Sequence, residues 1–394
     1  VPNLRFPEFE GEWQEKRLSD IADLSKGIGI SKDQLSADGE PCILYGELYT
    51  KYKSETIKEV ISKTNIDNTK LVKSKANDVI IPCSGETAEE IATARCVLKD
   101  DVLLGGDLNI IRLHGYDGSF MSYQLNGKRK YDIAKVAQGV SVVHLYGEHL
   151  KNIKTINPSL NEQKKIANLL SLLDERISTQ NKIIEDLKKL RSAISKHLFE
   201  RRDLLGTKIK LSKVAELKNG YAFQSSKYNS LGEWKIITIT NVTGERYIKE
   251  NDCNCILEIP NDIQKHQKLK ANDVLISLTG NVGRVSLCTE GLFLLNQRVG
   301  LLQLKVSEDR EYIYQALSSH KFENSMIACA QGAAQMNIGK GDVENYILPY
   351  SFNRKNINVV ASVLRAYDKY IINETNLQSI LHIQKQYLLR QMFI

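Results

Sequence analysis

Apolar residues between Asn161 and Phe199 recur at alternating steps of four and three positions, and no Gly or Pro interrupts the stretch. This spacing is typical of the buried seam of a coiled coil. At 1.5 Å per residue, the stretch predicts a helix of roughly 60 Å. An amphipathic helix on a globular core usually has about 8–20 residues, so we expect this one to pack along a helical partner. The seam comprises Ile166, Leu170, Leu173, Ile177, Gln180, Ile184, Leu187, Arg191, Ile194 and Leu198.

A second seam with the same spacing lies 194 residues further along and predicts a second long helix, from about Arg354 to Met392. The polar interruptions recur at equivalent positions, since Glu374 corresponds to Gln180 and Lys385 to Arg191. We expect the two helices to pair with each other. The full second seam comprises Val360, Leu364, Tyr367, Ile371, Glu374, Gln378, Leu381, Lys385, Leu388 and Met392.

The repeat extends beyond the helices to almost the whole chain of 394 residues. The matching segments are Leu18–Gly27 with Leu211–Gly220, Lys75–Val79 with Lys270–Val274, and Ala137–Gly139 with Ala330–Gly332. The repeated unit is too long, and its two copies are too few, for a solenoid protein. Each copy therefore reads as a globular segment, here called a head, followed by a long helix. We predict heads at residues 1–157 and 207–348, a central helix at 158–206 and a C-terminal helix at 349–394.

Within each head, short β-rich runs alternate with loops rich in Gly, Asn, Ser and Thr. We predict strands at Val79–Pro82, Val102–Leu104, Ile110–Leu113, Lys235–Thr240, Val274–Leu278, Val285–Cys288 and Val299–Leu304, and helices at Phe120–Lys128 and Glu311–Ser319. The expected fold class is α+β, with two pseudo-symmetric heads and mostly antiparallel sheets. The second helix must return from the second head toward the first, so the predicted helix pair is an antiparallel coiled coil.

Composition narrows the functional classes only slightly. With 42% hydrophobic and 26% charged residues, the chain has an ordinary soluble composition, and its net charge of +7 permits nucleic acid without requiring it. Seven Cys with no CxxC pair indicate reduced thiols and a cytoplasmic location. A zinc site through Cys253 and Cys255 would need two more nearby ligands, and His266 is the only candidate in that neighbourhood. There is no apolar run long enough for a membrane span. Because the sequence starts at Val1 rather than Met, we expect the true N-terminus to be missing.

The sequence offers no catalytic motif. Asn157–Leu160 lacks the second Pro and the aromatic residue that an amino-methyltransferase uses to hold a flipped base. Gly339–Gly341 does not have the surroundings of a phosphate-binding loop, and the seven His residues show no HExxH spacing. We therefore predict a non-enzyme.

Several segments carry recognisable motifs. The opening Pro2–Phe9, followed by Gly11 and Trp13, resembles the start of many specificity subunits of type I restriction–modification systems. The order head, helix, head, helix matches the family along the entire chain. The boundary between the second head and its helix departs from the family pattern, because Asn353–Ile357 lacks the Glu-Gln pair that stands at the boundary between the first head and its helix. The first boundary matches the family's central region through Pro158, Glu162, Gln163, Lys165, Ile166, Leu173, Asp174 and Ile177.

This resemblance implies that each head is a target-recognition domain that reads one half of a bipartite double-stranded DNA sequence. The helices would set the spacing between the halves and dock two methyltransferase subunits, and two motor–nuclease restriction subunits would complete the complex. The chain itself would hold no cofactor: S-adenosylmethionine would belong to the methyltransferase, and ATP and Mg to the restriction subunit. No membrane partner is implied.

DNA-contact candidates are cations for phosphates and polar or aromatic side chains for base edges. In the first head they are Tyr45, Tyr49, Lys51, Tyr52, Lys53, Ser84, Gly85, Thr87, Ser141 and His144. In the second head they are Tyr221, Asn241, Arg246, Tyr247, Thr279, Asn281, Arg284, Arg298, Gln335, Asn337 and Lys340. Structural alternatives stay open: a solvated hairpin tip at 45–53, simple turns after the strands, a solvated helix end at 126–131, a pocket-filling His144 and an ion-paired Arg298.

Two other functions also stay open. The chain could be a coiled-coil adaptor that binds only proteins, or a self-contained modification enzyme. Selection from random DNA by the methyltransferase-bound complex separates the first from the specificity function, and methylation by the isolated chain would support the second.

Overall fold

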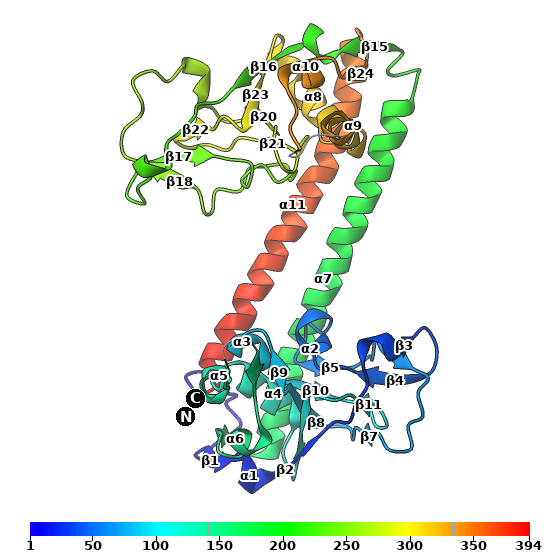
Figure 1. Ribbon diagram of the computed structural model, residues 1–394, viewed down its shortest axis with the longest axis vertical. Coiled ribbons are helices and arrows are strands. Elements are labelled where there is room, and N and C mark those ends of the chain that lie inside the picture. Colours follow the sequence, from blue (N-terminus) through cyan, green and yellow to red (C-terminus); the bar gives the residue numbers. More distant parts are fainter. Residues whose placement is uncertain (140–141, 332–335) are drawn as a thin grey trace. The chain divides into compact units, whose positions relative to one another are not determined.

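The computed structural model describes residues 1–139, 142–331 and 336–394 (Figure 1). The chain forms two compact units: unit 1 comprises Val1–Asn181 and Asn376–Ile394, and unit 2 comprises Lys182–Thr375. Each unit contains one head and one half of each long helix. Among the described residues, no helix combines the length and apolar character that crossing a membrane requires.

The two long helices are α7 (Leu160–Glu200) and α11 (Arg354–Gln391), drawn in green and in orange to red in Figure 1. Every residue of the two predicted seams is buried or half-buried, and α7 and α11 pack together as expected.

Pairs of residues along α7 and α11 give the direction of packing within each unit. In unit 1, Asp174 pairs with Lys385, and Asn181 accepts a hydrogen bond from Gln378. In unit 2, Arg191 pairs with Asp368. The Asn356 side chain donates to the carbonyl oxygen of Leu204, just beyond the end of α7. Because the numbers on one helix rise as those on the other fall, the helices are antiparallel within each unit.

Unit 1 contains two five-stranded sheets, with strand orders β2-β12-β8-β10-β5 and β3-β6-β4-β11-β7, and the two-stranded pairs β1-β14 and β9-β13. Its strands are β1 Gln14–Arg17, β2 Ala22–Lys26, β3 Leu35–Ser36, β4 Glu40–Ile43, β5 Thr56–Ile57, β6 Ser62–Thr64, β7 Val72–Lys73, β8 Asp78–Pro82, β9 Ser84–Gly85, β10 Arg95–Val97, β11 Leu103–Leu104, β12 Leu108–Leu113, β13 Val143–His144 and β14 Lys154–Asn157. Its helices are α1 Leu18–Ile21, α2 Glu47–Thr50, α3 Ala88–Ile91, α4 Gly118–Asn126, α5 Lys130–Val136 and α6 Gly147–Lys151.

Unit 2 contains two four-stranded sheets, with strand orders β16-β23-β20-β21 and β18-β17-β22-β19, and the pair β15-β24. Its strands are β15 Thr207–Lys210, β16 Ala215–Asn219, β17 Trp234–Ile237, β18 Asn254–Ile256, β19 Lys268–Leu269, β20 Val274–Ser277, β21 Val285–Leu287, β22 Phe293–Leu295, β23 Val299–Leu304 and β24 Ile347–Tyr350. Its shorter helices are α8 Arg310–Leu317, α9 His320–Ala330 and α10 Lys340–Glu344.

The two heads share one topology over four strands of each sheet. The order β2-β12-β8-β10 in unit 1 corresponds to β16-β23-β20-β21 in unit 2, and β6-β4-β11-β7 corresponds to β18-β17-β22-β19. The parallel pair β4-β11 has its counterpart in β17-β22, while most other pairs are antiparallel. The α+β prediction is thus confirmed. The predicted strand Lys235–Thr240 ends early, at Ile237, because the Asn241 side chain accepts from the Thr238 N–H and closes a turn there.

Apolar side chains of the long helices belong to the cores of both units. In unit 1, Trp13, Phe120 and Phe393 belong to one apolar cluster. Trp13 meets Phe120 edge-on, and the ring centroids of Phe120 and Phe393, which lies just beyond the end of α11, are 5.1 Å apart. In unit 2, Leu198 of α7 and Leu364 of α11 join the core beneath the sheet that contains β20. Each head is therefore seated on its own half of the helix pair by shared apolar burial.

Candidate nucleic-acid interface

In unit 1, the turn after the central strand β8 meets the loop that precedes α6. Strands β9 and β13 pair antiparallel, with Ser84 opposite His144 and Gly85 opposite Val143. The Leu145 N–H also donates to the Cys83 carbonyl oxygen, with an N···O distance of 2.8 Å. Ser84 and Gly85 are buried by this pairing, whereas the His144 side chain is exposed. Two segments that the sequence singled out separately thus form one surface.

Unit 2 repeats this arrangement with different side chains. Thr279 forms a bridge opposite Asn337, the Gly280 N–H donates to the Met336 carbonyl oxygen at 3.0 Å, and the Ile338 N–H donates to that of Leu278 at 2.9 Å. Two other candidates, Ser141 and Gln335, lie just before His144 and Asn337 in the sequence and are outside the described residues.

A third segment lies beside the same strand ends. It is the turn that leads from one sheet to the other, between β11 and β12 in unit 1 and between β22 and β23 in unit 2. In unit 1 the Cys83 N–H donates to the Asp107 carbonyl oxygen at 2.7 Å, and in unit 2 the Leu278 N–H donates to that of Arg298 at 2.9 Å. Tyr221 joins this surface in unit 2, because its carbonyl oxygen accepts from the Gln297 N–H at 2.9 Å. Tyr221, Thr279, Arg298 and Asn337 are therefore brought together.

Aromatic side chains extend the surface of unit 1. The ring of Tyr146 stacks on His144 with centroids 6.2 Å apart and meets His149 edge-on at 5.7 Å. The ammonium of Lys26 lies 5.7 Å from the centroid of Tyr146. Sequence reasoning missed Lys26 and Tyr146, although Tyr146 is only two positions from the candidate His144.

Comparisons with known proteins identify this architecture. The profile of the family described as Type I restriction modification DNA specificity domain matches residues 10–189 and again residues 207–382. The chain belongs to this family. It is a DNA specificity subunit of a type I restriction–modification system, with two target-recognition domains, and is itself non-catalytic.

Relatives from Methanocaldococcus jannaschii are similar over most of their length. The type I restriction enzyme MjaVIII specificity subunit is 26% identical over 374 residues, which cover 88% of this chain and 83% of the relative. The putative MjaX specificity subunit is 24% identical over 384 residues, which cover 87% and 84%.

Solved structures share the fold. The S subunit of a type I system from M. genitalium superposes with a TM-score of 0.65 at 18% identity, covering 100% of this chain and 99% of that one. A chain from a structural study of complex assembly and conformational transition of the type I R-M system gives a TM-score of 0.55 at 14% identity, with 97% of both chains covered.

The segment Tyr45–Lys53 of the specificity subunit contains the short helix α2 rather than a hairpin tip. Tyr49 is half-buried there, and burial, reinforced by the charges of Glu86 and Glu90, raises the pKa of its phenol. Tyr45 is also half-buried, and Thr87 caps α3 by accepting from the Glu90 N–H.

The two lysines of this segment differ in their partners. The Lys51 ammonium lies 2.5 Å from a carboxylate oxygen of Glu47 and 2.8 Å from the Ser62 hydroxyl. Lys53 is exposed, and within the described chain its ammonium makes no ion pair. Lys53 is therefore the more available phosphate-binding cation of the two.

Two predicted DNA contacts are core residues, so these predictions were wrong. Tyr52 is buried, its hydroxyl accepts from the Ile61 N–H at 3.2 Å, and burial raises its pKa to about 12. Asn241 is buried as well, and its amide closes the turn after β17 and donates to the Lys249 carbonyl oxygen at 2.9 Å. Their side chains hold loops in place and are not presented to a ligand.

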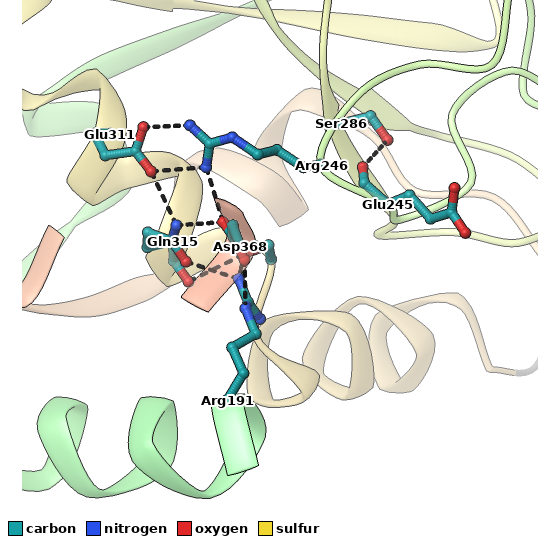
Figure 2. Close-up of polar contacts among 8 residues, drawn as sticks. Arg191, Glu245, Arg246, Ser286, Glu311, Gln315 and Asp368 are labelled. Atoms are coloured by element: carbon teal, nitrogen blue, oxygen red, sulfur yellow. Dashed lines mark hydrogen bonds and ion pairs between the residues drawn. The ribbon is translucent and has the colours of Figure 1, made fainter. Parts of the chain in front are cut away.

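Arg246 was also assigned to the wrong role, because its guanidinium is bound within the protein (Figure 2). One nitrogen lies 2.6 Å from Glu311, another lies 2.8 Å from Asp368 on α11, and the side chain is only 9% exposed. Although burial alone would raise the pKa of Glu311, its hydrogen bonds with Arg246 and Gln315 lower it. Arg246 thus attaches the second head to the helix pair.

Asp368 is the centre of this network. It also accepts from the Arg191 guanidinium of α7 at 2.8 Å and from the Gln315 amide of α8 at 2.7 Å. Gln315 in turn accepts from Arg191 at 2.7 Å. The polar interruption of the first seam at Arg191 therefore has a buried acid of the second helix as its partner.

Unit 1 contains an equivalent network with the helices exchanged. Asp174 of α7 and Glu55 of the first head each lie 2.6 Å from the Lys385 ammonium of α11, and the hydroxyls of Ser54 and Tyr123 both donate to Asp174 at 2.8 Å. Burial opposes the charge of Lys385, but the two carboxylates outweigh it and raise the pKa of the ammonium. Burial also raises the pKa of Glu55.

The remaining candidates of the second head keep some accessibility. Arg298 is exposed, and within the described residues its guanidinium has neither an ion pair nor a hydrogen bond. The alternative that Arg298 is a structural ion-pair partner therefore finds no support among these residues. Arg284 lies 3.6 Å from Glu323, and the Tyr221 hydroxyl donates to Asp262 at 2.9 Å. Lys340 is bound to Glu216 at 2.8 Å, Tyr247 is partly exposed, and Asn281 is exposed.

The basic segment 126–131 serves the fold in part. The Asn126 amide makes two hydrogen bonds with the backbone of Ala94, and Arg129 donates to the Ile394 carbonyl oxygen.

In the part of the chain that the structure describes, no group of three or more His, Cys, Asp or Glu side chains is placed to hold a metal ion.

Proposed function

We propose that each head reads one half of a bipartite double-stranded DNA target through the surface at the end of its central strand. The supporting observation is that three separate segments converge at this strand end in both heads, β8 in one and β20 in the other. The surface carries His144 and Tyr146 in the first head and Arg298 and Asn337 in the second. A shared scaffold with different exposed side chains suits recognition of two different sequences.

We further propose that the helices set the gap between the half-sites and dock two methyltransferase subunits. On α11, five exposed apolar residues each lie one position before a buried or half-buried seam residue and therefore follow the four–three pattern of the seam: Val359, Val363 and Tyr370 in unit 2, and Ile380 and Tyr387 in unit 1. Tyr370 is 61% exposed and Ile380 is 59% exposed. Exposed apolar positions with this spacing suit a partner helix, and each unit offers its own stretch.

The catalytic chemistry belongs to the partners in this proposal. The methyltransferase subunits bring S-adenosylmethionine, and two restriction subunits bring ATP and Mg. The specificity subunit holds no cofactor and supplies DNA contacts and spacing only.

Selection from random double-stranded DNA by the complex of this chain with its methyltransferase tests the proposal. We expect a bipartite motif with an unspecified gap. Replacing residues 207–348 with the second head of a related subunit should change only one half of the motif, because the two strand-end surfaces are built independently. Absence of any enriched motif would favour the adaptor function, and a change in both halves would contradict independent reading.

Phosphate binding gives a second expected result. Lys53→Ala should weaken binding to all sequences alike and reduce the slope of log affinity against log salt by about 0.9, the value for one neutralised phosphate. Lys99→Ala is a suitable control, because Lys99 is exposed but follows β10 at Val97, which pairs with Asp78 at the opposite end of β8. An unchanged salt slope in Lys53→Ala would remove Lys53 from the interface.

A further inference from the structure

The turn that enters β12 in the first head and β23 in the second has the same position but different residues. It reads Gly105-Gly106-Asp107 in unit 1 and Asn296-Gln297-Arg298 in unit 2. The Gly105 N–H donates to the Ile43 carbonyl oxygen at 3.0 Å, and the Asn296 N–H donates to that of Ile237 at 3.2 Å. Because Ile43 and Ile237 end the equivalent strands β4 and β17, these bonds fix the correspondence of the two turns.

Within this turn, Asp107 and Arg298 are equivalent residues. Each accepts, through its carbonyl oxygen, from the residue that ends or follows the central strand, Cys83 in one head and Leu278 in the other. Both side chains are exposed, and within the described residues neither charged group makes a hydrogen bond or an ion pair. The fold therefore does not require either charge.

We propose that Asp107 and Arg298 occupy the same base-reading position in the two heads and determine which base each head prefers there. This inference rests on the proposed function. A carboxylate is repelled by DNA phosphates, so the favourable DNA contact for Asp107 is an exocyclic amino group. In the major groove, cytosine and adenine present such donors. Arg298 has five donors and suits the O6 and N7 acceptors of guanine.

The chemistry gives a specific expectation for the motif. The half-site of the first head should contain a cytosine or adenine at the position of Asp107, and that of the second head should contain a guanine at the position of Arg298. Gln297, which is also exposed, lies beside Arg298 and can contact the neighbouring base pair.

Two charge-neutralising variants test the inference in the intact complex with the methyltransferase. Asp107 has a φ of 58°, and Asn tolerates this left-handed conformation, so Asp107→Asn removes the charge without straining the turn. Arg298→Gln neutralises the second head. Asp101→Asn is the matched control for the first, because Asp101 is exposed with a φ of 61° at the opposite end of β8. The exposed Arg202 provides the control Arg202→Gln.

Selection from random DNA is the measurement, with thermal unfolding recorded for every variant. Asp107→Asn should reduce discrimination at one position of the first half-site by roughly 5–150-fold, with the second half-site unchanged. Arg298→Gln should do the converse, and both controls should retain the parent motif. An unchanged motif, a uniform loss of affinity for all sequences, or changes in both half-sites would overturn the inference. If the parent complex itself selects no bipartite motif, the proposed function fails first, which is a distinguishable outcome.

Discussion

Asp368→Ala is expected to lower the free energy of unfolding of unit 2 by about 3–5 kcal/mol, the range for removing one partner of a buried ion pair. Asp368 is buried and is bound by Arg191 of α7, Arg246 of the second head and Gln315 of α8. Its removal leaves two guanidinium groups in a buried site with less compensating charge. The head and both helices should lose a common attachment point.

The tryptophans allow this effect to be measured in one unit. The chain has two Trp residues, Trp13 in unit 1 and the half-buried Trp234 in unit 2. In a Trp13→Phe background, urea unfolding followed by Trp fluorescence reports on unit 2 alone. Asp186→Ala is the control, because Asp186 is an exposed helical acid 3.7 Å from Lys189, and such surface pairs contribute about 0–1 kcal/mol. Equal effects of the two substitutions would contradict a structural role for the network.

Insertion of one heptad into both long helices is expected to lengthen the gap of the DNA motif by two or three base pairs. Seven residues keep the seam in phase and add about 10 Å of helix, and base pairs are about 3.4 Å apart along each strand. The insertions belong between Asn181 and Lys182 of α7 and between Thr375 and Asn376 of α11, where the two compact units divide. Contacts within each unit, such as Asp174 with Lys385, are then preserved.

The methylated or selected motif of the extended complex is the measurement. Both half-motifs should stay unchanged, because no residue of either head is altered. Insertion into α7 alone is the control and should destabilise the chain, since it shifts the antiparallel pairs of one unit out of register. An active complex with the original gap would exclude the helices as the spacing element.

The helix pair could be predicted from sequence because a heptad pattern is a local property. The seam positions followed from this periodicity, and the equivalence of Arg191 with Lys385 followed from the internal repeat of 194 residues. The head residues that join these networks could not be predicted in the same way. Glu55, which pairs with Lys385, and Arg246, which pairs with Asp368, come from loops whose positions depend on the tertiary fold.

The candidate interface shows the limits of residue type as a criterion. Tyr52, Asn241 and Arg246 have suitable chemistry for DNA, but burial commits them to the fold. Asp107 is exposed but was not among the candidates, because an acid is not expected on a DNA-binding surface. Its position became visible only through its structural equivalence with Arg298.

The order of synthesis places a constraint on the folding of unit 1. Its aromatic core combines Trp13 and Phe120 with Phe393, and its charged network includes Lys385, yet all of unit 2 is made between these segments. At about 5–20 residues per second, the ribosome needs roughly 10–40 s to add residues 182–375. During this time, the apolar seam of α7 and one side of the first core lack their partners, so the nascent chain exposes a surface that chaperones bind and that can aggregate. Translation speed through unit 2 should therefore affect how much of the subunit reaches its native state.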